Sequence, residues 1–160
     1  MSSFLIKSPA IEKFQAKAFL FVMGFWRRMT LGARALVVDG EKVLLIKHTY
    51  TTGWLLPGGG VEAGQHMRET AIREVAEETG YRVKDAGELI SVYHNADASC
   101  RDHVALFVFK DFEVEAPFMP SVEIAEMGWF SIHELPVDTT KATVSRVAEY
   151  FGGQSVSDYW

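Results

Sequence analysis

Short blocks of apolar residues alternate with polar ones along the chain, and their spacing predicts both strands and helices. Runs rich in β-branched and aromatic residues predict strands over residues 33–38, 43–46, 54–56, 89–93, 104–109 and 127–131. Asp39-Gly40 indicates a hairpin turn between the first two runs. The sheet therefore starts with a hairpin and receives later strands from distant parts of the chain.

Helical spacing predicts helices over residues 66–79 and 139–151, and Gly80 stands where helices commonly end. Residues 113–121, which contain two prolines, are expected to be irregular, and a polar tail follows the second helix. Strands mixed with helices in this order predict an α+β fold, an α/β/α sandwich with a mixed sheet between helices.

The N-terminal segment predicts one further helix over residues 9–28, with Ser8 as N-cap and Pro9 at the first helical position. Its apolar run, residues 18–26, is too short to span a bilayer and lacks the small residues of a signal-peptide cleavage site. We expect a helical extension over residues 1–30 and one domain over residues 31–160. The extension can pack on its own domain, on a second copy in a homodimer, or weakly on a membrane surface.

Composition restricts the function and the compartment. The 160 residues carry a net charge of −5, which disfavours non-specific binding to nucleic acid because that needs a basic face. The single cysteine, Cys100, excludes an intramolecular disulfide and fits a reducing compartment, so we expect a cytoplasmic protein.

Three carboxylates share one face of the helix over residues 66–79. Glu74, Glu77 and Glu78 are spaced i, i+3, i+4, and Arg73 flanks them. Like charges at this spacing repel, and a Mg²⁺ ion would offset the repulsion because it prefers carboxylate oxygens. The alternative is a solvated acidic face, which the helix alone favours.

The loop before this helix favours a site instead. Gly58, Gly59 and Gly60 lead towards the helix, and glycine lets the backbone approach a ligand closely. The positive end of a helix dipole also attracts anions such as phosphate. A phosphate-binding loop joined to a metal-binding helix would form one site.

Residues 59–81, GGVEAGQHMRETAIREVAEETGY, resemble the Nudix box. The matching positions are Gly59, Arg73, Glu74, Val75, Glu77, Glu78 and Gly80. Gln65 stands where the box has its first Glu, and Tyr81 where an aliphatic residue is usual. The resemblance extends over about residues 31–150, including Trp54 to Gly59 and the segments 123–130 and 134–136.

The resemblance implies a Nudix-like fold and hydrolysis of a nucleoside diphosphate linked to another moiety, or of a related organic pyrophosphate, by water attack on phosphorus. It implies Mg²⁺, with Mn²⁺ as an alternative, bound by Glu74, Glu77 and Glu78. Glu123 or Glu74 would be the general base, Glu126 the next candidate, and Arg73 would orient the ligands. The substrate would contact the glycine loop, and Trp54 would stack on a base unless it packs in the core.

Two other functions are compatible with the fold. One is a non-catalytic Nudix-fold regulator that binds a nucleotide, although such domains usually lose box carboxylates that are present here. The other is an isomerase of isoprenoid diphosphates, which would need an acid–base cysteine, and Cys100 lies outside the matching positions.

Overall fold

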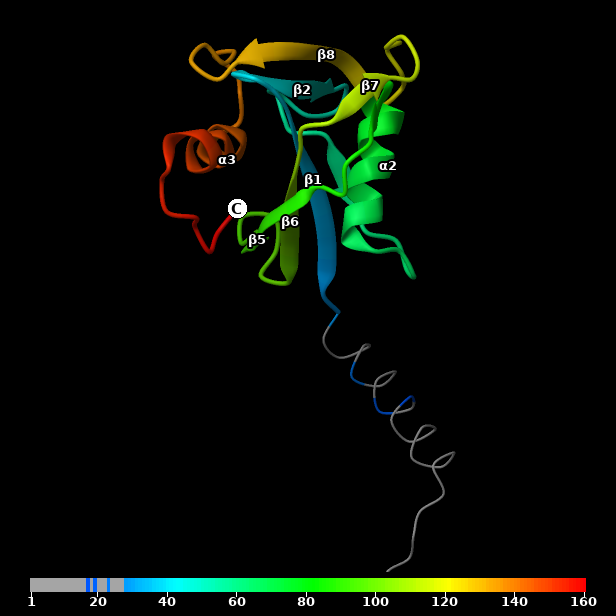
Figure 1. Ribbon diagram of the computed structural model, residues 1–160. Helices are drawn as coiled ribbons and strands as arrows, with labels where there is room; N and C mark the ends of the chain where they lie inside the picture. Colours follow the sequence, from blue (N-terminus) through cyan, green and yellow to red (C-terminus); the bar gives the residue numbers. More distant parts are fainter. Residues whose placement is uncertain (1–16, 18, 20–22, 24–27) are drawn as a thin grey trace, which may run out of the picture.

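The computed structural model describes residues 17, 19, 23 and 28–160 (Figure 1). The helix expected over residues 9–28, and its contact with a domain, a second copy or a membrane, lie outside these residues or depend on residues that do. Within the described part, no helix is both long enough and apolar enough to cross a membrane.

A mixed sheet forms the centre of the domain. Its strand order is β5-β6-β1-β2-β8, with β3 also paired to β1. Strand β1 runs parallel to β6, and the other pairs are antiparallel. The bounds are β1 Thr30–Asp39, β2 Lys42–His48, β3 Gly58–Gly60, β5 Glu88–His94, β6 Asp102–Phe109 and β8 Ile124–Ser131. The predicted mixed sheet is confirmed.

One helix lies on each side of this sheet (Figure 1). Helix α2, Met67–Thr79, buries Ala71 and Val75 against one apolar cluster of the strands. Helix α3, Lys141–Gly152, buries Val147 in the cluster on the other face. Strand residues alternate between the two faces, so β1 supplies side chains to both clusters. The predicted α/β/α sandwich is confirmed.

The segment expected to be irregular contains a short strand, so that prediction is wrong at its start. Strand β7, Phe112–Val114, pairs with β4, Tyr81–Val83, in a separate two-stranded sheet. An aromatic cluster of Tyr81, Phe112 and Trp129 stabilises this pair. Tyr81, the unusual residue at the end of the box, therefore packs, and its hydroxyl accepts a 3.0 Å hydrogen bond from Trp129 Nε1.

The C-terminal tail is attached to the domain by a buried ion pair. Arg146 and Glu149, 2% and 8% exposed, form a 2.6 Å ion pair within α3. Arg146 also donates to the carbonyl of Tyr159, and its guanidinium lies over the rings of Tyr93 and Trp160. The tail is polar in sequence, but these contacts give it a fixed place beside β5.

Candidate active site

A pocket of about 480 Å³ lies between the glycine loop, helix α2 and the start of β6. Carboxylates, one guanidinium and glycine backbone dominate its walls. It is lined by Thr30, Leu31, Gly32, Arg34, His48, Tyr50, Gly58, Gly59, Gly60, Glu74, Glu78, Asn95, Asp102, Val104 and Glu123. The structure therefore gathers box residues together with residues from β1, β2, the β5–β6 connection and the segment before β8.

Glu78 is the most buried of the helix carboxylates. Its side chain is 8% exposed, and Oε2 accepts a 2.8 Å hydrogen bond from the backbone N–H of Gly58. Burial raises the pKa of Glu78 to about 8, although the Gly58 N–H and the Arg34 guanidinium act in the opposite direction. A carboxylate buried in this way needs a cation before it can ionise near neutral pH.

Glu74 faces the same pocket beside Gly59. Its Oε1 lies 2.8 Å from a guanidinium nitrogen of Arg73. Burial raises the pKa of Glu74, and the Arg73 charge partly opposes this. A Cβ on Gly59 would lie 2.4 Å from Glu74 Oε1, so the residue after Gly58 has to be glycine for this carboxylate to keep its position.

Glu77 is not brought into the pocket. Its side chain is 59% exposed, and Oε2 forms a 2.7 Å ion pair with Arg73, four residues earlier. No cluster of three or more His, Cys, Asp or Glu side chains suited to a metal is present among the described residues. The single acidic face expected from the helix wheel is thus divided, because Glu78 turns into the domain and Glu77 turns to solvent.

Of the two acidic candidates before and within β8, Glu123 lines the pocket. Its backbone carbonyl accepts a 2.8 Å hydrogen bond from Thr49 N–H, just after an irregularity in the β2–β8 register between Lys47 and His48. Glu126 instead lies 3.9 Å from Lys47, outside the pocket lining. The β2–β8 pairing therefore brings Glu123 towards the helix carboxylates from a different element.

Arg34 extends from β1 into the pocket and holds the glycine loop. It donates hydrogen bonds to the carbonyls of Leu56 (3.0 Å) and Gly58 (2.7 Å), which holds the glycine loop against β1. Burial lowers the pKa of its guanidinium, and Glu78 and Glu74 oppose the change. In the sequence, the one sign of this role is the position of Arg34 as a single charged residue inside an apolar strand.

His48 also lines the pocket, with Nε2 3.8 Å from Glu78 Oε1. Burial lowers the pKa of its imidazole, and the Arg34 charge lowers it further, which favours the neutral ring. His48 is the last residue of β2. No metal-ligand spacing in the sequence marked it as a site residue.

Trp54 is not brought to the pocket. It is 8% exposed and packs edge-on against Phe130, with 4.6 Å between ring centroids, in the cluster on the α3 side of the sheet. Of the two roles predicted for Trp54, the structure shows packing in the core and not a place in the pocket. The two residues 54–55 form isolated bridges and no continuous strand.

Gln65, the departure from the box, braces the start of α2. Its Oε1 accepts a 3.0 Å hydrogen bond from the hydroxyl of buried Thr70. His66 caps the helix: its side chain accepts from Arg68 N–H, and Glu69 accepts from His66 N–H. The bond to Thr70 needs a hydrogen-bond acceptor at position 65, and a neutral side chain such as Gln65 supplies it.

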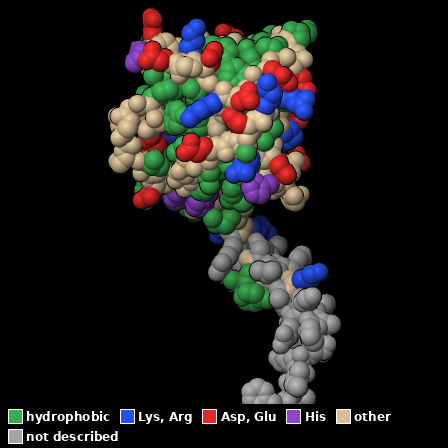
Figure 2. Space-filling view, in the orientation of Figure 1, with side chains coloured by type: hydrophobic (Ala, Val, Ile, Leu, Met, Phe, Trp, Pro, Cys, Tyr) green, Lys and Arg blue, Asp and Glu red, His purple; other side chains and the backbone are tan. Residues whose placement is uncertain are grey.

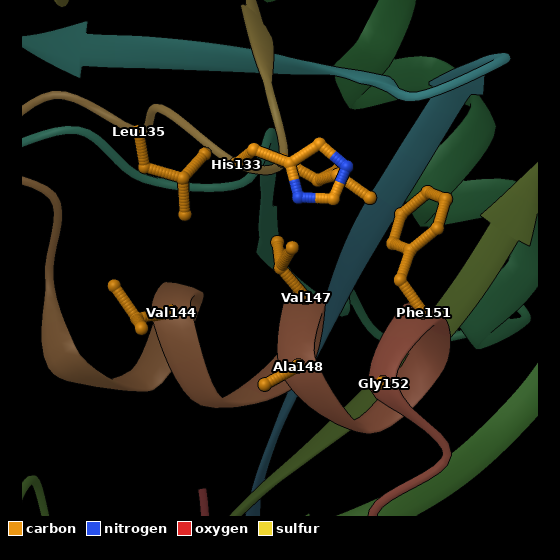
Figure 3. Close-up of a pocket in the computed structure, with 8 residues that line it drawn as sticks. His133, Leu135, Val144, Val147, Ala148, Phe151 and Gly152 are labelled. Carbon is orange, nitrogen blue, oxygen red and sulfur yellow. The ribbon is translucent and has the colours of Figure 1, made fainter.

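A second, apolar pocket of about 240 Å³ lies between α3 and the segment after β8 (Figure 3). Val144, Val147 and Phe151 line it from the helix, and Leu135 faces them. Its only ionisable lining residue is His133, which lies 3.6 Å from Glu41. This pocket has no chemistry for phosphate or metal, so the acidic pocket is the candidate active site.

The acidic pocket fits a divalent cation. Mg²⁺ is commonly bound through one or two protein carboxylates, with waters and substrate phosphates in its remaining positions. Glu74 and Glu78 supply two such carboxylates, and the lack of a side chain at Gly59 leaves room for the Glu74 carboxylate at the pocket wall.

Comparison with known proteins agrees with this geometry. A model of the NUDIX domain matches residues 28–150. The chain belongs to the Nudix family. Its Nudix domain therefore includes the box helix α2, the glycine loop, β8 and most of α3.

Named Nudix relatives are moderately similar to the chain. The ADP-ribose pyrophosphatase of Methanocaldococcus jannaschii is 33% identical over 110 residues, which span 64% of this chain and 64% of that protein's length. A putative 8-oxo-dGTP diphosphatase of Bacillus subtilis is 31% identical over 109 residues, 68% of this chain and 70% of that protein. The solved structure of a UDP-X diphosphatase has a TM-score of 0.65 and 26% identity, covering 89% of this chain and 73% of that chain.

Proposed function

We propose that the chain is a Mg²⁺-dependent pyrophosphohydrolase that cleaves a nucleoside diphosphate linked to another moiety, or a related organic pyrophosphate. The main support is that the side chains of Glu74, Glu78 and Glu123 line one pocket beside Gly58–Gly60. Relatives with names of this kind, such as the ADP-ribose pyrophosphatase and the UDP-X diphosphatase, support the reaction type.

Glu74 and Glu78 would hold the ion, and Glu77 would join them after it leaves Arg73. A bound Mg²⁺ would neutralise charge on phosphate oxygens and lower the pKa of a water molecule. Mn²⁺ has the same preference for carboxylate oxygens and is the alternative ion. Arg73 acts as a positioning residue, because it contacts Glu74 and orients its carboxylate beside the metal position, and it holds Glu77 until Glu77 moves to the ion.

Glu123 is the proposed general base. As water attacks phosphorus, the proton of the water passes to a Glu123 carboxylate oxygen and a new P–O bond forms. The bridging P–O bond breaks, and its electron pair leaves with the bridging oxygen on the departing phosphate product. This division of roles is supported by the elements involved: Glu74 and Glu78 come from α2, and Glu123 enters from the segment before β8. Glu74 is the alternative base.

A substrate panel tests the proposal. Nucleoside diphosphate sugars, nucleoside triphosphates and dinucleoside polyphosphates are incubated with Mg²⁺, with Mn²⁺ or with EDTA, and the phosphate-bearing products are quantified. Metal-dependent cleavage of at least one substrate class supports a hydrolase. Tight binding of a nucleotide without cleavage under all conditions would favour the non-catalytic regulator instead.

The proposal includes a small-molecule substrate and a cytoplasmic location. A net charge of −5, and the mixture of acidic and basic side chains on the face drawn in Figure 2, support a small substrate over nucleic acid. The exposed Cys100 is compatible with a reducing compartment. Contact of the N-terminal extension with a second copy or with a membrane remains part of the proposal, tested by light scattering and by liposome co-sedimentation of the full chain.

A further inference from the structure

The pocket has a second polar end, about four residues along β1 from Arg34. Thr30, Gly32 and Arg34 are spaced two apart along β1 and therefore share one face of the strand, and all three line the pocket. Of the residues between them, Ala33 is buried and Leu31 is exposed at the rim. Four residues of a strand span roughly 13 Å. Gly32 lies between the two ends, so no side chain of β1 divides the pocket there.

Three side chains build this end. Asp102 Oδ1 accepts a 2.7 Å hydrogen bond from the Thr30 hydroxyl, and Asp102 Oδ2 accepts a 2.8 Å bond from Asn95 Nδ2. Asn95 and Asp102 are also joined through their backbones, because Asn95 N–H donates to the carbonyl of Asp102 at 2.9 Å. The carboxylate is therefore held at a fixed place at the start of β6, paired with Thr30 in the parallel ladder.

These bonds leave mainly acceptors facing the pocket. The Thr30 hydroxyl proton and one Asn95 amide proton are engaged by Asp102, while each Asp102 oxygen and the Asn95 carbonyl oxygen keep free lone pairs. A group that donates hydrogen bonds is therefore favoured at this end, and the second Asn95 amide proton is the donor left on these three side chains. Carboxylates accept from ribose hydroxyls in the same way in dinucleotide-binding folds.

The charge of the pocket adds a second restriction. Its lining contains the carboxylates of Glu74, Glu78, Glu123 and Asp102 against the single guanidinium of Arg34. A metal ion bound at Glu74 and Glu78 would neutralise charge near the glycine loop and leave the Asp102 end negative. A substrate with further phosphates at that end would meet like charge, which costs affinity.

We propose that Asp102 and Asn95 select the substrate, by accepting hydrogen bonds from sugar hydroxyls on the far side of the diphosphate and by repelling substrates that carry further phosphates there. The inference rests on the proposed function and narrows its substrate class to diphosphates that bear an uncharged sugar. The diphosphate would lie near Arg34 and Glu78, and the sugar would extend along Gly32 to Asp102.

The test pairs variants with matched substrates. The best sugar-bearing substrate of the wild type is compared with analogues in which single sugar hydroxyls are replaced by hydrogen. Asp102→Asn should raise KM for the intact substrate about tenfold, as expected for loss of a charge-assisted hydrogen bond, with kcat largely kept. For one deoxy analogue, Asp102→Asn should have almost no effect on KM.

Asp97→Asn is the matched control, because it makes the same charge change at an exposed position of the same connection. Thr30→Val removes one hydrogen-bond partner of Asp102 but keeps the Asp102 charge. This variant should keep the difference in KM between the intact substrate and the deoxy analogue. Asp102→Lys should raise the relative kcat/KM for a diphosphorylated inositol polyphosphate. Melting temperatures identify any variant that fails to fold.

The outcomes separate the two claims. No cleavage of any substrate by the wild type overturns the proposed function itself. Cleavage by the wild type, combined with an equal KM change for intact and all deoxy substrates in Asp102→Asn, overturns the selection by Asp102. A KM effect that depends on an amino group of the base, and not on a sugar hydroxyl, also overturns it.

Discussion

The backbone N–H of Gly58 donates a 2.8 Å hydrogen bond to the buried carboxylate of Glu78, twenty residues later in the chain. This bond joins the glycine loop to the helix that follows it. Arg34 holds the same loop from the other side through the carbonyl of Gly58. The loop and the helix therefore act as one unit, and changes in either should affect the same site.

Glu78 and Glu77 should respond differently to removal of their charge. Glu78→Gln should reduce Mg²⁺-dependent turnover by a factor on the order of 100 or more, because one of the two pocket carboxylates that would hold the metal loses its charge. Its fold should persist, since the amide is of equal size and the carboxyl itself has a pKa of about 8. Glu77→Gln should lose less turnover, because Glu77 is 59% exposed and paired with Arg73, which it must leave before it can join the metal. Steady-state kinetics and thermal melts measure both; full activity of Glu78→Gln would remove Glu78 from the site.

The metal-free protein should become less stable as pH rises through about 8. The pKa of Glu78 is raised to about 8 from an ordinary value of 4.5, so the folded state binds a proton that the unfolded state releases. The stabilisation is complete below pH 4.5 and is lost as pH rises through 8. The measurement is the melting temperature of the wild type minus that of Glu78→Gln, in EDTA, between pH 5 and 9. This difference should decline with rising pH, and Mg²⁺ should make the decline smaller. A flat difference across that range would contradict the assignment.

The three glycines of the loop should differ in what they tolerate. Gly58→Ala should destabilise the fold, because φ is +144° and a Cβ would lie 2.1 Å from the carbonyl oxygen of Ala33. Gly59→Ala should mainly impair metal affinity and turnover by displacing the Glu74 carboxylate. Gly60→Ala is the control, since a Cβ there has no neighbour within 4 Å. Equal behaviour of Gly59→Ala and Gly60→Ala, measured by Mg²⁺ titration of activity, would show that Glu74 needs no such space.

Local patterns in the sequence predicted the mixed sheet, the two described helices and the box residues. They did not predict the division of the acidic face, because the wheel gives the direction of Glu77 and Glu78 but not the partners of each. Arg73 holds Glu77 in solvent, while Gly58 reaches Glu78 only after the loop has folded.

Long-range pairing explains the other differences. Arg34, Asn95 and Asp102 meet in one pocket only because β1 and β6 are parallel neighbours, and that pairing is not readable from local spacing. Trp54 lies only four residues before Gly58 in sequence, yet its side chain packs in the cluster on the α3 side of the sheet. The attachment of the polar tail depends on buried Arg146 and Glu149, whose helical spacing alone would suggest an ordinary surface pair.

The buried ion pair in α3 should matter for stability. Glu149→Gln would leave the Arg146 guanidinium without its charged partner, and removal of one member of a buried pair typically costs about 3–5 kcal/mol. Glu113→Gln is the control, because its pair with Lys84 is exposed and such pairs contribute about 0–1 kcal/mol. Urea unfolding of both variants gives the two free energies, and equal values would contradict a structural role for the pair.

Gln65 should be replaceable by the Glu that the box usually has. Glu at this position keeps an acceptor for the Thr70 hydroxyl and adds negative charge near the start of α2, which the helix dipole favours. Gln65→Glu should therefore keep stability and turnover. Gln65→Ala should cost about 1–3 kcal/mol, because buried Thr70 loses its partner. Unfolding free energies distinguish them, and a strong activity change in Gln65→Glu would show that its neutral charge matters.

Hydrolysis in ¹⁸O-labelled water tests the central claim most directly. The best substrate of the panel is turned over with Mg²⁺ in labelled water, and the products are analysed by mass spectrometry, with Glu78→Gln as the comparison of reduced activity. Attack of water on phosphorus predicts one ¹⁸O atom in a phosphate group of one product, formed only with the metal. Label on a carbon-bound oxygen, or no metal-dependent product from any substrate, would contradict the assignment of the pocket as a pyrophosphohydrolase site.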